Sequence, residues 1–170
     1  MKYVYLSAAA AIALSLGGCA TSVSAPTAVQ PLATDSTMPL HISDVSADAA
    51  SGVQVGDADL GLICQKVKAY MKAQSPAVMV DAGTPSAYQM KIHMTRFDRG
   101  NSFARFMLVG LGQIHIEGTV DLDDSSGKSV AQYKVVKDFA LGGVAGGTTT
   151  VEDVEEGFAK SVAEIAKGKS

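Results

Sequence analysis

Strict alternation of apolar and polar residues runs through Tyr88-Gln-Met-Lys-Ile-His-Met-Thr-Arg-Phe-Asp98 and again through Ile114-His-Ile-Glu-Gly-Thr-Val-Asp-Leu-Asp123. In both stretches, as far as Met94 and Leu122, the even-numbered positions are apolar or glycine and the odd-numbered positions are polar. A period of two puts one face of a strand on a hydrophobic core and the other face in water. The two stretches therefore predict neighbouring strands of a half-buried sheet.

A third strand is expected over residues 129–139. It follows Ser125-Ser-Gly-Lys128, which is typical of a four-residue hairpin loop with a positive φ at Gly127. The pairing that brings apolar residues opposite one another places Leu122 beside Ala131. The stretch from 88 to 139 is thus predicted to form three consecutive antiparallel strands.

Amphipathic segments flank these strands on both sides. A weakly alternating strand is expected at 41–48, a helix at 58–74 with Asp57 as its N-cap, and a short strand at 77–81. A second helix is expected at 151–167, opened by a capping box at Thr149-Thr-Val-Glu152 and closed by Gly168. The order β-α-β-β-β-α predicts an α+β two-layer sandwich, in which two amphipathic helices cover one face of a mainly antiparallel sheet.

The first residues have the features of a secretion signal. Lys2 is followed by the apolar run 4–16, which is shorter than the ~20 residues needed to span a bilayer. Leu16-Gly-Gly-Cys19 resembles the lipobox of bacterial lipoproteins. The resemblance implies cleavage between Gly18 and Cys19, a diacylglycerol on Cys19 and an added acyl chain such as palmitate. Because Ala20 and not Asp follows, it also implies the outer membrane of a Gram-negative cell, on the periplasmic side.

Three regions follow from this interpretation: a signal peptide at 1–18, a lipidated cysteine with a flexible linker at 19–40, and a domain at 41–170. The linker holds three of the five prolines and shows no hydrophobic period. Fully extended, it would reach ~70 Å and let the domain stand off the membrane. Once Cys19 carries lipid, Cys64 has no partner for a disulfide, and it is expected to be a buried, unreactive thiol.

Composition argues against several classes of function. The net charge of −3, the absence of tryptophan and the 6% aromatic content disfavour a nucleic-acid surface. The sequence shows no recognisable triad and no nucleotide-binding fingerprint. In the expected register His93 and His115 lie ~13 Å apart, too far to share a metal ion. We therefore expect no catalytic residues, no metal and no cofactor.

A pattern of arginines and glycines resembles the DUF4410 family of small bacterial lipoproteins. Its parts are Arg96-Phe-Asp-Arg-Gly100, Arg105, Gly110-Leu-Gly112, the turn Gly127-Lys128 after Asp123, and a glycine-rich run before the last helix. The resemblance covers residues 41–167. It implies an envelope lipoprotein without assigned activity, similar in layout to accessory parts of envelope machines.

The expected pairing of Lys91 with Asp121 places Arg96 beside Ile116, and the second hairpin places Lys137 beside the same isoleucine. Basic groups on a core-facing row either reach the rim of the sheet or are paired. Together with Arg99 and Arg105 on the next segment, Arg96 and Lys137 could instead form a seat for an anion or for a partner's carboxylate.

The segment 99–113 is apolar for a surface loop. It either folds back over the sheet, which we favour, or is exposed to a partner or a membrane. Its glycines and those of the later run are expected to allow close backbone approach. These glycines are Gly110, Gly112, Gly142, Gly143, Gly146 and Gly147.

Together these features predict a non-enzymatic interaction or accessory module of a periplasmic or outer-membrane assembly. Its expected partners are the membrane, through lipid on Cys19, and a protein of the envelope. The alternative is a binding protein for an anionic envelope ligand, such as a lipid headgroup or a cell-wall fragment.

Overall fold

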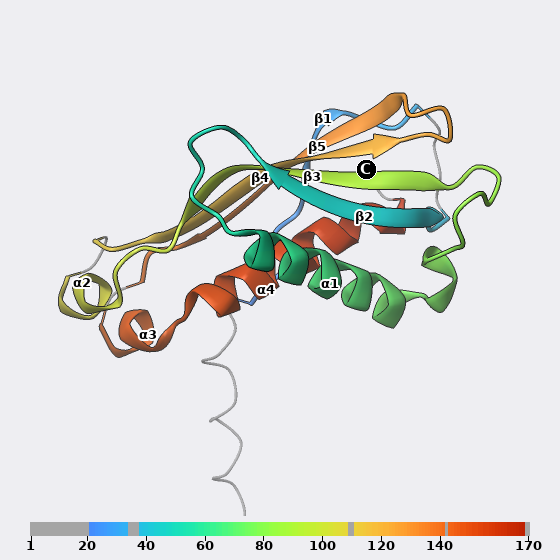
Figure 1. Cartoon of the computed structure of the whole chain (residues 1–170). Helices are drawn as coiled ribbons and strands as arrows, with labels where there is room; N and C mark the ends of the chain where they lie inside the picture. The colour runs from blue at the N-terminus through green and yellow to red at the C-terminus, as the bar shows by residue number, and fades with distance from the viewer. Residues whose placement is uncertain (1–20, 34–37, 109–110, 142, 169–170) are drawn as a thin grey trace, which may run out of the picture.

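The fold is a five-stranded sheet with two long helices on one face, as the computed structural model shows (Figure 1). The structure describes residues 21–33, 38–108, 111–141 and 143–168. The strands are β1 (Thr27–Gln30), β2 (Ile42–Ala49), β3 (Tyr88–Asp98), β4 (Ile114–Asp123) and β5 (Ser129–Phe139). Their order in the sheet is β1-β5-β4-β3-β2. The predicted α+β two-layer sandwich is confirmed.

The two long helices are α1 (Asp57–Gln74) and α4 (Val151–Glu164). Ile63, Val67 and Met71 of α1 are buried, as are Val154 and Phe158 of α4, so each helix presents an apolar stripe to the sheet. α4 continues as the 3-10 turn η2 (Ile165–Lys167), which ends at a left-handed Gly168. The core lies between this helical layer and one face of the sheet.

The predicted registers hold over most of the three central strands. Leu122 faces Ala131, and Lys91 faces Asp121. β2 is an edge strand and runs parallel to β3, because α1 carries the chain across the sheet between them. The remaining sheet contacts are antiparallel.

A bulge at Thr95 overturns one predicted pairing. β3 shifts its register between Met94 and Arg96, so Arg96 faces Glu117 instead of Ile116. An extra residue in one strand reverses the faces of everything beyond it. Phe97 therefore enters the core, and Arg96 lies on the exposed face.

Four further expectations need correction. Residues 27–30, expected in the linker, form β1 at the edge of the sheet. The expected strand at 77–81 is the 3-10 turn η1 (Pro76–Val78), because Pro76 fixes a helical first turn, and only Met79 bridges to β2. The capping box of α4 lies one residue later than expected, on Thr150 and Asp153, and Gly56, not Asp57, is the N-cap of α1.

Candidate functional site

Two short helices form an apolar tip at one end of the sheet. They are α2 (Ser102–Met107), between β3 and β4, and α3 (Gly143–Thr148), between β5 and α4. Figure 1 shows both beyond the ends of the strands, away from the β4–β5 hairpin. We use the term tip for α2, α3 and the residues that flank them, 99–113 and 140–150.

Large apolar side chains are exposed on this tip. Phe103 and Val144 each expose 73% of their surface. The others are Phe106, Met107, Leu108, Leu111 and Leu141. The expectation that 99–113 packs over the sheet is therefore wrong: its apolar residues lie on a separate helical tip and face outward.

α2 and α3 pack against each other closely. A Cβ on Gly147 would come within 3.0 Å of the Phe106 ring, so glycine at this position allows the two helices to approach. A groove of about 360 Å3 runs between them, lined by Phe103, Phe106 and Val144 among others. The tip is therefore both apolar and hollowed.

Arg105 holds the tip together from inside. It exposes only 3% of its surface; its Nη1 donates to the carbonyl oxygen of Gly112 at 2.7 Å and its Nη2 to that of Thr149 at 3.0 Å. These bonds tie the segment after α2 to the start of α4. Burial lowers the pKa of the Arg105 guanidinium. Its planar fork serves two backbone carbonyls inside the fold.

Gly112 and Gly100 shape the ends of the α2 segment. Both have a positive φ, and a Cβ on Gly112 would collide with the carbonyl oxygen of Asn101. Asn101 in turn caps α2, because its side chain accepts a hydrogen bond from the backbone N–H of Ala104. Gly110 and Gly142 lie outside the described residues.

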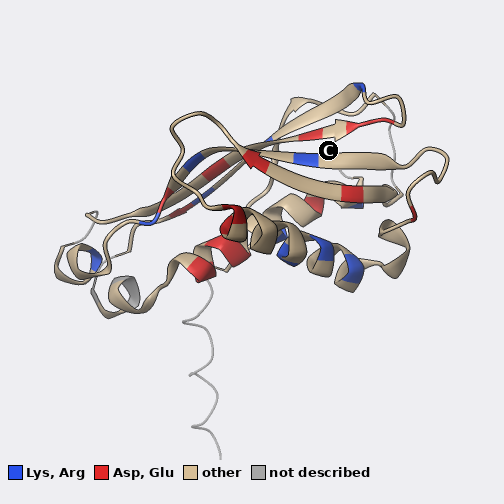
Figure 2. Ribbon diagram, viewed as in Figure 1, with Lys and Arg blue, Asp and Glu red and all other residues tan. Residues whose placement is uncertain are grey.

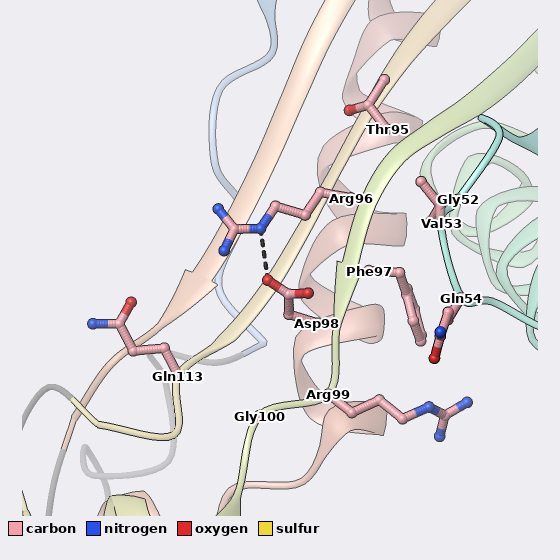
Figure 3. Close-up of a pocket in the computed structure, with 10 residues that line it drawn as sticks. All are labelled: Gly52, Val53, Gln54, Thr95, Arg96, Phe97, Asp98, Arg99, Gly100 and Gln113. Carbon is pink, nitrogen blue, oxygen red and sulfur yellow. Dashed lines mark hydrogen bonds and ion pairs between the residues drawn. The ribbon is translucent and has the colours of Figure 1, made fainter.

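The basic residues singled out in the sequence do not converge on one point. Arg96 Nε donates to Asp98 Oδ2 at 2.6 Å, and Arg99 Nη2 donates to Asp59 Oδ2 of α1 at 2.5 Å. Figure 3 shows the Arg96 and Arg99 side chains pointing away from each other, on opposite sides of the end of β3. Both line an open cleft of about 740 Å3, with Gly52, Phe97 and Gln113 among its other residues.

Lys137 lies on the core side of β5, as predicted from its register, and exposes only 4% of its surface. Its Nζ donates to the carbonyl oxygen of Ser22 at 2.9 Å and to Ser22 Oγ at 2.8 Å. The backbone N–H of Ser24 donates to Ser161 Oγ on α4. Sequence reasoning missed these contacts, because a serine-rich segment gives no sign of the partner that will hold it.

Cys64 is half-buried and burial raises the pKa of its thiol, which disfavours the reactive thiolate. Gly18 and Cys19 lie outside the described residues. Within the described part of the chain, no group of three or more His, Cys, Asp and Glu could hold a metal ion, and no helix is long and apolar enough to cross a bilayer.

Several solved structures share this fold. A dodecamer of a PelC point variant from Paraburkholderia phytofirmans matches with a TM-score of 0.54 and 11% identity, covering 83% of this chain and 95% of that chain. A PelC dodecamer from the same organism in another crystal form matches with a TM-score of 0.50 and 12% identity, covering 78% and 89%. At such low identity the likeness establishes the fold and nothing more.

A protein from Caulobacter crescentus CB15, described as a candidate lipoprotein, matches with a TM-score of 0.36 and 15% identity over 72% of this chain and 84% of that one, too weakly to support an argument. No curated protein matches the sequence. The family model described as Domain of unknown function (DUF4410) matches residues 65–143, from the second half of α1 to the start of α3. The resemblance predicted from the arginines and glycines is therefore confirmed over these residues.

Proposed function

We propose that this chain is a lipid-anchored, non-enzymatic protein of the bacterial envelope whose interaction surface is the α2–α3 tip. The observation that carries the proposal is the set of large apolar side chains exposed on the tip. Soluble domains seldom expose such side chains in groups, and where they do the patch is usually an interaction site. The exposed side chains lie on a defined structure, because Arg105, Asn101 and the close contacts of two glycines hold the shape of the tip.

The anchor in this proposal is lipid on Cys19, at the periplasmic face of the outer membrane. Its support is the sequence of the first twenty residues. Two or three acyl chains hold a protein stably on a bilayer, whereas one holds it only reversibly.

The non-enzymatic part of the proposal is supported by the work that the polar side chains do in the fold. Arg105 and Lys137 bind backbone carbonyls, and Lys66 pairs with the buried Glu155 at 3.4 Å. Two of the three histidines pair with neighbouring carboxylates: His93 with Asp48, and His115 with Asp138. The donors of Arg105 and Lys137 are used by backbone carbonyls inside the fold, which supports a structural role for these two residues.

Self-association is part of the proposal. The PelC structures of the same fold are dodecamers, which supports the idea that this chain also works as several copies. Mass photometry of the lipid-free chain and of the acylated chain in detergent tests this directly. A single monomeric species in both preparations would remove self-association from the proposal and leave the tip as the interaction surface.

Two experiments in cells test the core of the proposal. Metabolic labelling with an alkyne fatty acid should tag the chain, and Cys19→Ser should abolish the tag. A photo-crosslinking residue at 103 should give adducts in intact cells, whereas one at 126, in the β4–β5 hairpin at the opposite end of the sheet, should give none. Equal yields from the two positions would overturn the assignment of the tip as the interaction surface.

The alternative, binding of an anionic envelope ligand, is favoured by one observation: Arg96 and Arg99 line the 740 Å3 cleft. Each guanidinium is already paired with a carboxylate, so an anion would have to displace Asp98 or Asp59. Titration with glycerol phosphate, followed by amide NMR, tests this alternative. Shifts confined to residues 95–100 that vanish in the Arg96→Met, Arg99→Met double variant would support it.

A further inference from the structure

We propose that the α2–α3 tip docks on the same lipid bilayer that holds the Cys19 tether, so that the domain meets the membrane at two points and in one orientation. This inference rests on the proposed function and deepens it, because it names the bilayer as the partner of the tip. The inference follows from the contacts that bind Ser22 and Ser24, which are among the described residues nearest to Cys19, to the domain.

The described chain begins at Thr21, two residues after Cys19, and is fixed to the domain almost at once. Lys137 binds Ser22 through two hydrogen bonds, and Ser161 binds the backbone of Ser24. Further on, Thr27 faces Lys134 in the sheet. Followed back towards Cys19, the chain thus moves from the middle of β5 to its carboxyl end.

The carboxyl end of β5 is the end that leads into the tip. Lys137 is two residues before the last residue of β5, Phe139, and four before the exposed Leu141. Four residues span at most ~14 Å, and the three residues from Cys19 to Ser22 at most ~11 Å. Lipid on Cys19 would therefore attach within ~11 Å of Ser22, which is held near the end of β5 that leads into the tip. The opposite end of the sheet carries the β4–β5 hairpin.

This geometry changes the role expected for the linker. A free linker of ~70 Å would let the domain tumble above the bilayer. With Ser22 held, almost none of that length remains between the lipid and the domain. A bilayer that takes the acyl chains of Cys19 then lies within reach of α2 and α3, before any protein partner has to be present.

The surface of the tip suits a lipid interface. Residues 99–113 and 140–150 contain no aspartate or glutamate; the sequence of α2 contains one basic residue and that of α3 contains none. Figure 2 shows the acidic residues gathered on other parts of the fold. That basic residue, Arg105, is buried, and Arg99 is paired with Asp59. The large side chains that face outward are apolar, led by Phe103, Phe106 and Val144 around the groove, and the polar residues beside them, Ser102 and Thr148, are small and uncharged. Apolar side chains without a carboxylate can enter the boundary between headgroups and acyl chains without burying a charge.

A second contact adds orientation more than affinity. The acyl chains on Cys19 already hold the protein on the membrane. Insertion of the tip would fix the orientation of the sheet relative to the membrane. The β4–β5 hairpin, with its loop at 124–128, would then lie on the side away from the bilayer.

The absence of tryptophan from the chain makes a clean test possible. Phe103→Trp and Val144→Trp report on the tip, and Ser126→Trp, in the hairpin, is the matched control. The acylated full-length protein is reconstituted in vesicles of phosphatidylethanolamine and phosphatidylglycerol, with or without brominated acyl chains. Circular dichroism confirms that each variant is folded; the three replaced side chains are exposed, so each should be.

We expect emission from positions 103 and 144 to shift to the blue and to fall at least twofold with brominated lipid, and emission from position 126 to stay unchanged. Adding Lys137→Met, which frees Ser22, should reduce quenching at 103 while the protein still floats with the vesicles. Equal, unquenched emission from 103 and 126 on vesicle-bound protein would overturn the inference and leave the lipid anchor standing.

Other occupants of the tip give their own results. A blue shift at 103 that grows with protein concentration without vesicles would identify a second copy and overturn the bilayer assignment. Crosslinks in cells from 103 to protein only, together with no quenching in vesicles, would also overturn it, although the tip would remain the interaction surface. A chain that carries no lipid and does not float with vesicles would overturn the anchor and this inference together.

Discussion

Lys137 and Ser22 lie 115 positions apart in the sequence and are joined by two hydrogen bonds from the lysine Nζ, at 2.9 Å to the carbonyl oxygen and at 2.8 Å to Oγ. The lysine is nearly buried on the core side of β5, with its charged end towards the first described residues of the chain. One side chain thus couples the segment that follows Cys19 to the strand that leads into the tip. The position of the first described residues is therefore linked to that end of the sheet.

Replacing Lys137 tests this coupling. Lys137→Met keeps most of the volume and removes the donor, so hydrogen exchange of residues 22–30 should rise about tenfold, which corresponds to ~1.4 kcal/mol of local stability. Lys134→Met, on the exposed face of the same strand and paired with Glu117, is the control and should leave that exchange nearly unchanged. Similar protection of residues 22–30 in both variants would show that the contacts of Ser24 and β1 suffice to hold the segment.

Arg105 should be the basic residue of the tip that matters most for stability. Arg105→Met leaves the carbonyl oxygens of Gly112 and Thr149 without its donors, and we expect a loss of ~2–4 kcal/mol in the free energy of unfolding. Arg105→Lys should recover only part of this, because an ammonium cannot reproduce the planar fork. Arg96→Met, which removes only an exposed pair with Asp98, should cost less than ~1 kcal/mol. Urea unfolding measures all three; equal costs for the two methionine variants would contradict the structural role of Arg105.

Alanine substitutions at Gly112 and Gly127 should distinguish the cost of a left-handed backbone from the cost of a steric collision. Both have a positive φ, but a Cβ meets nothing within 4 Å at Gly127, whereas at Gly112 it collides with Asn101 and comes within 2.9 Å of the Ala104 Cβ. Gly127→Ala should therefore cost ~1 kcal/mol, from its left-handed conformation alone. Gly112→Ala should cost more by at least ~1–2 kcal/mol and should loosen α2, which hydrogen exchange of residues 102–108 would detect. Equal costs would mean that the backbone around Gly112 yields freely.

Glu155 should make stability depend on pH. Burial raises the pKa of its carboxyl, and Lys66 only partly opposes the shift. A raised pKa in the folded state means that the protonated form stabilises the fold; this contribution is complete below the ordinary pKa of glutamate and is lost as pH rises through the raised value. Glu155→Gln removes the dependence, so its melting temperature relative to the unsubstituted protein should increase from pH 4 to pH 7.

For a domain of this size, a difference of ~1 kcal/mol in the free energy of unfolding corresponds to a difference of ~2–4 °C in melting temperature. Glu152→Gln, on an exposed position of the same first turns of α4, is the comparison: its charge contributes only a minor part of the raised pKa of Glu155, so it should show a smaller trend in the same direction. A Glu155→Gln effect that stays constant across the pH range would mean that the lost pairing with Lys66, not burial, dominates at this site.

The central strands could be predicted because their pattern is local. From residues 88 to 94 and from 118 to 122 the alternation assigns each side chain to a face, and the hairpin loop sets the register. The bulge was missed because that reasoning extends a period of two without interruption. Phe97, an apolar residue at an odd position three residues after Met94, is the visible sign that the period breaks there.

β1 and the tip show what a single sequence does not contain. All four residues of β1 are exposed, so no hydrophobic period marks the strand, and its backbone pairs with a distant partner. The apolar residues of the 99–113 segment are compatible with a buried segment, which the sequence favoured, and with an exposed interaction surface. Only the tertiary positions of α2 and α3 decide between them, because Phe106 packs on Gly147 while Phe103 and Val144 face outward.

The pairing of β1 with β5 has a consequence for the order of folding. Thr27 meets Lys134, so the first strand of the domain is completed by its last strand, and closing so long a loop is slow compared with forming the neighbouring hairpins. During synthesis the segment that forms β1 emerges first and has to wait for nearly the whole domain before its backbone finds a partner. Assembly of this sheet therefore finishes where the chain began.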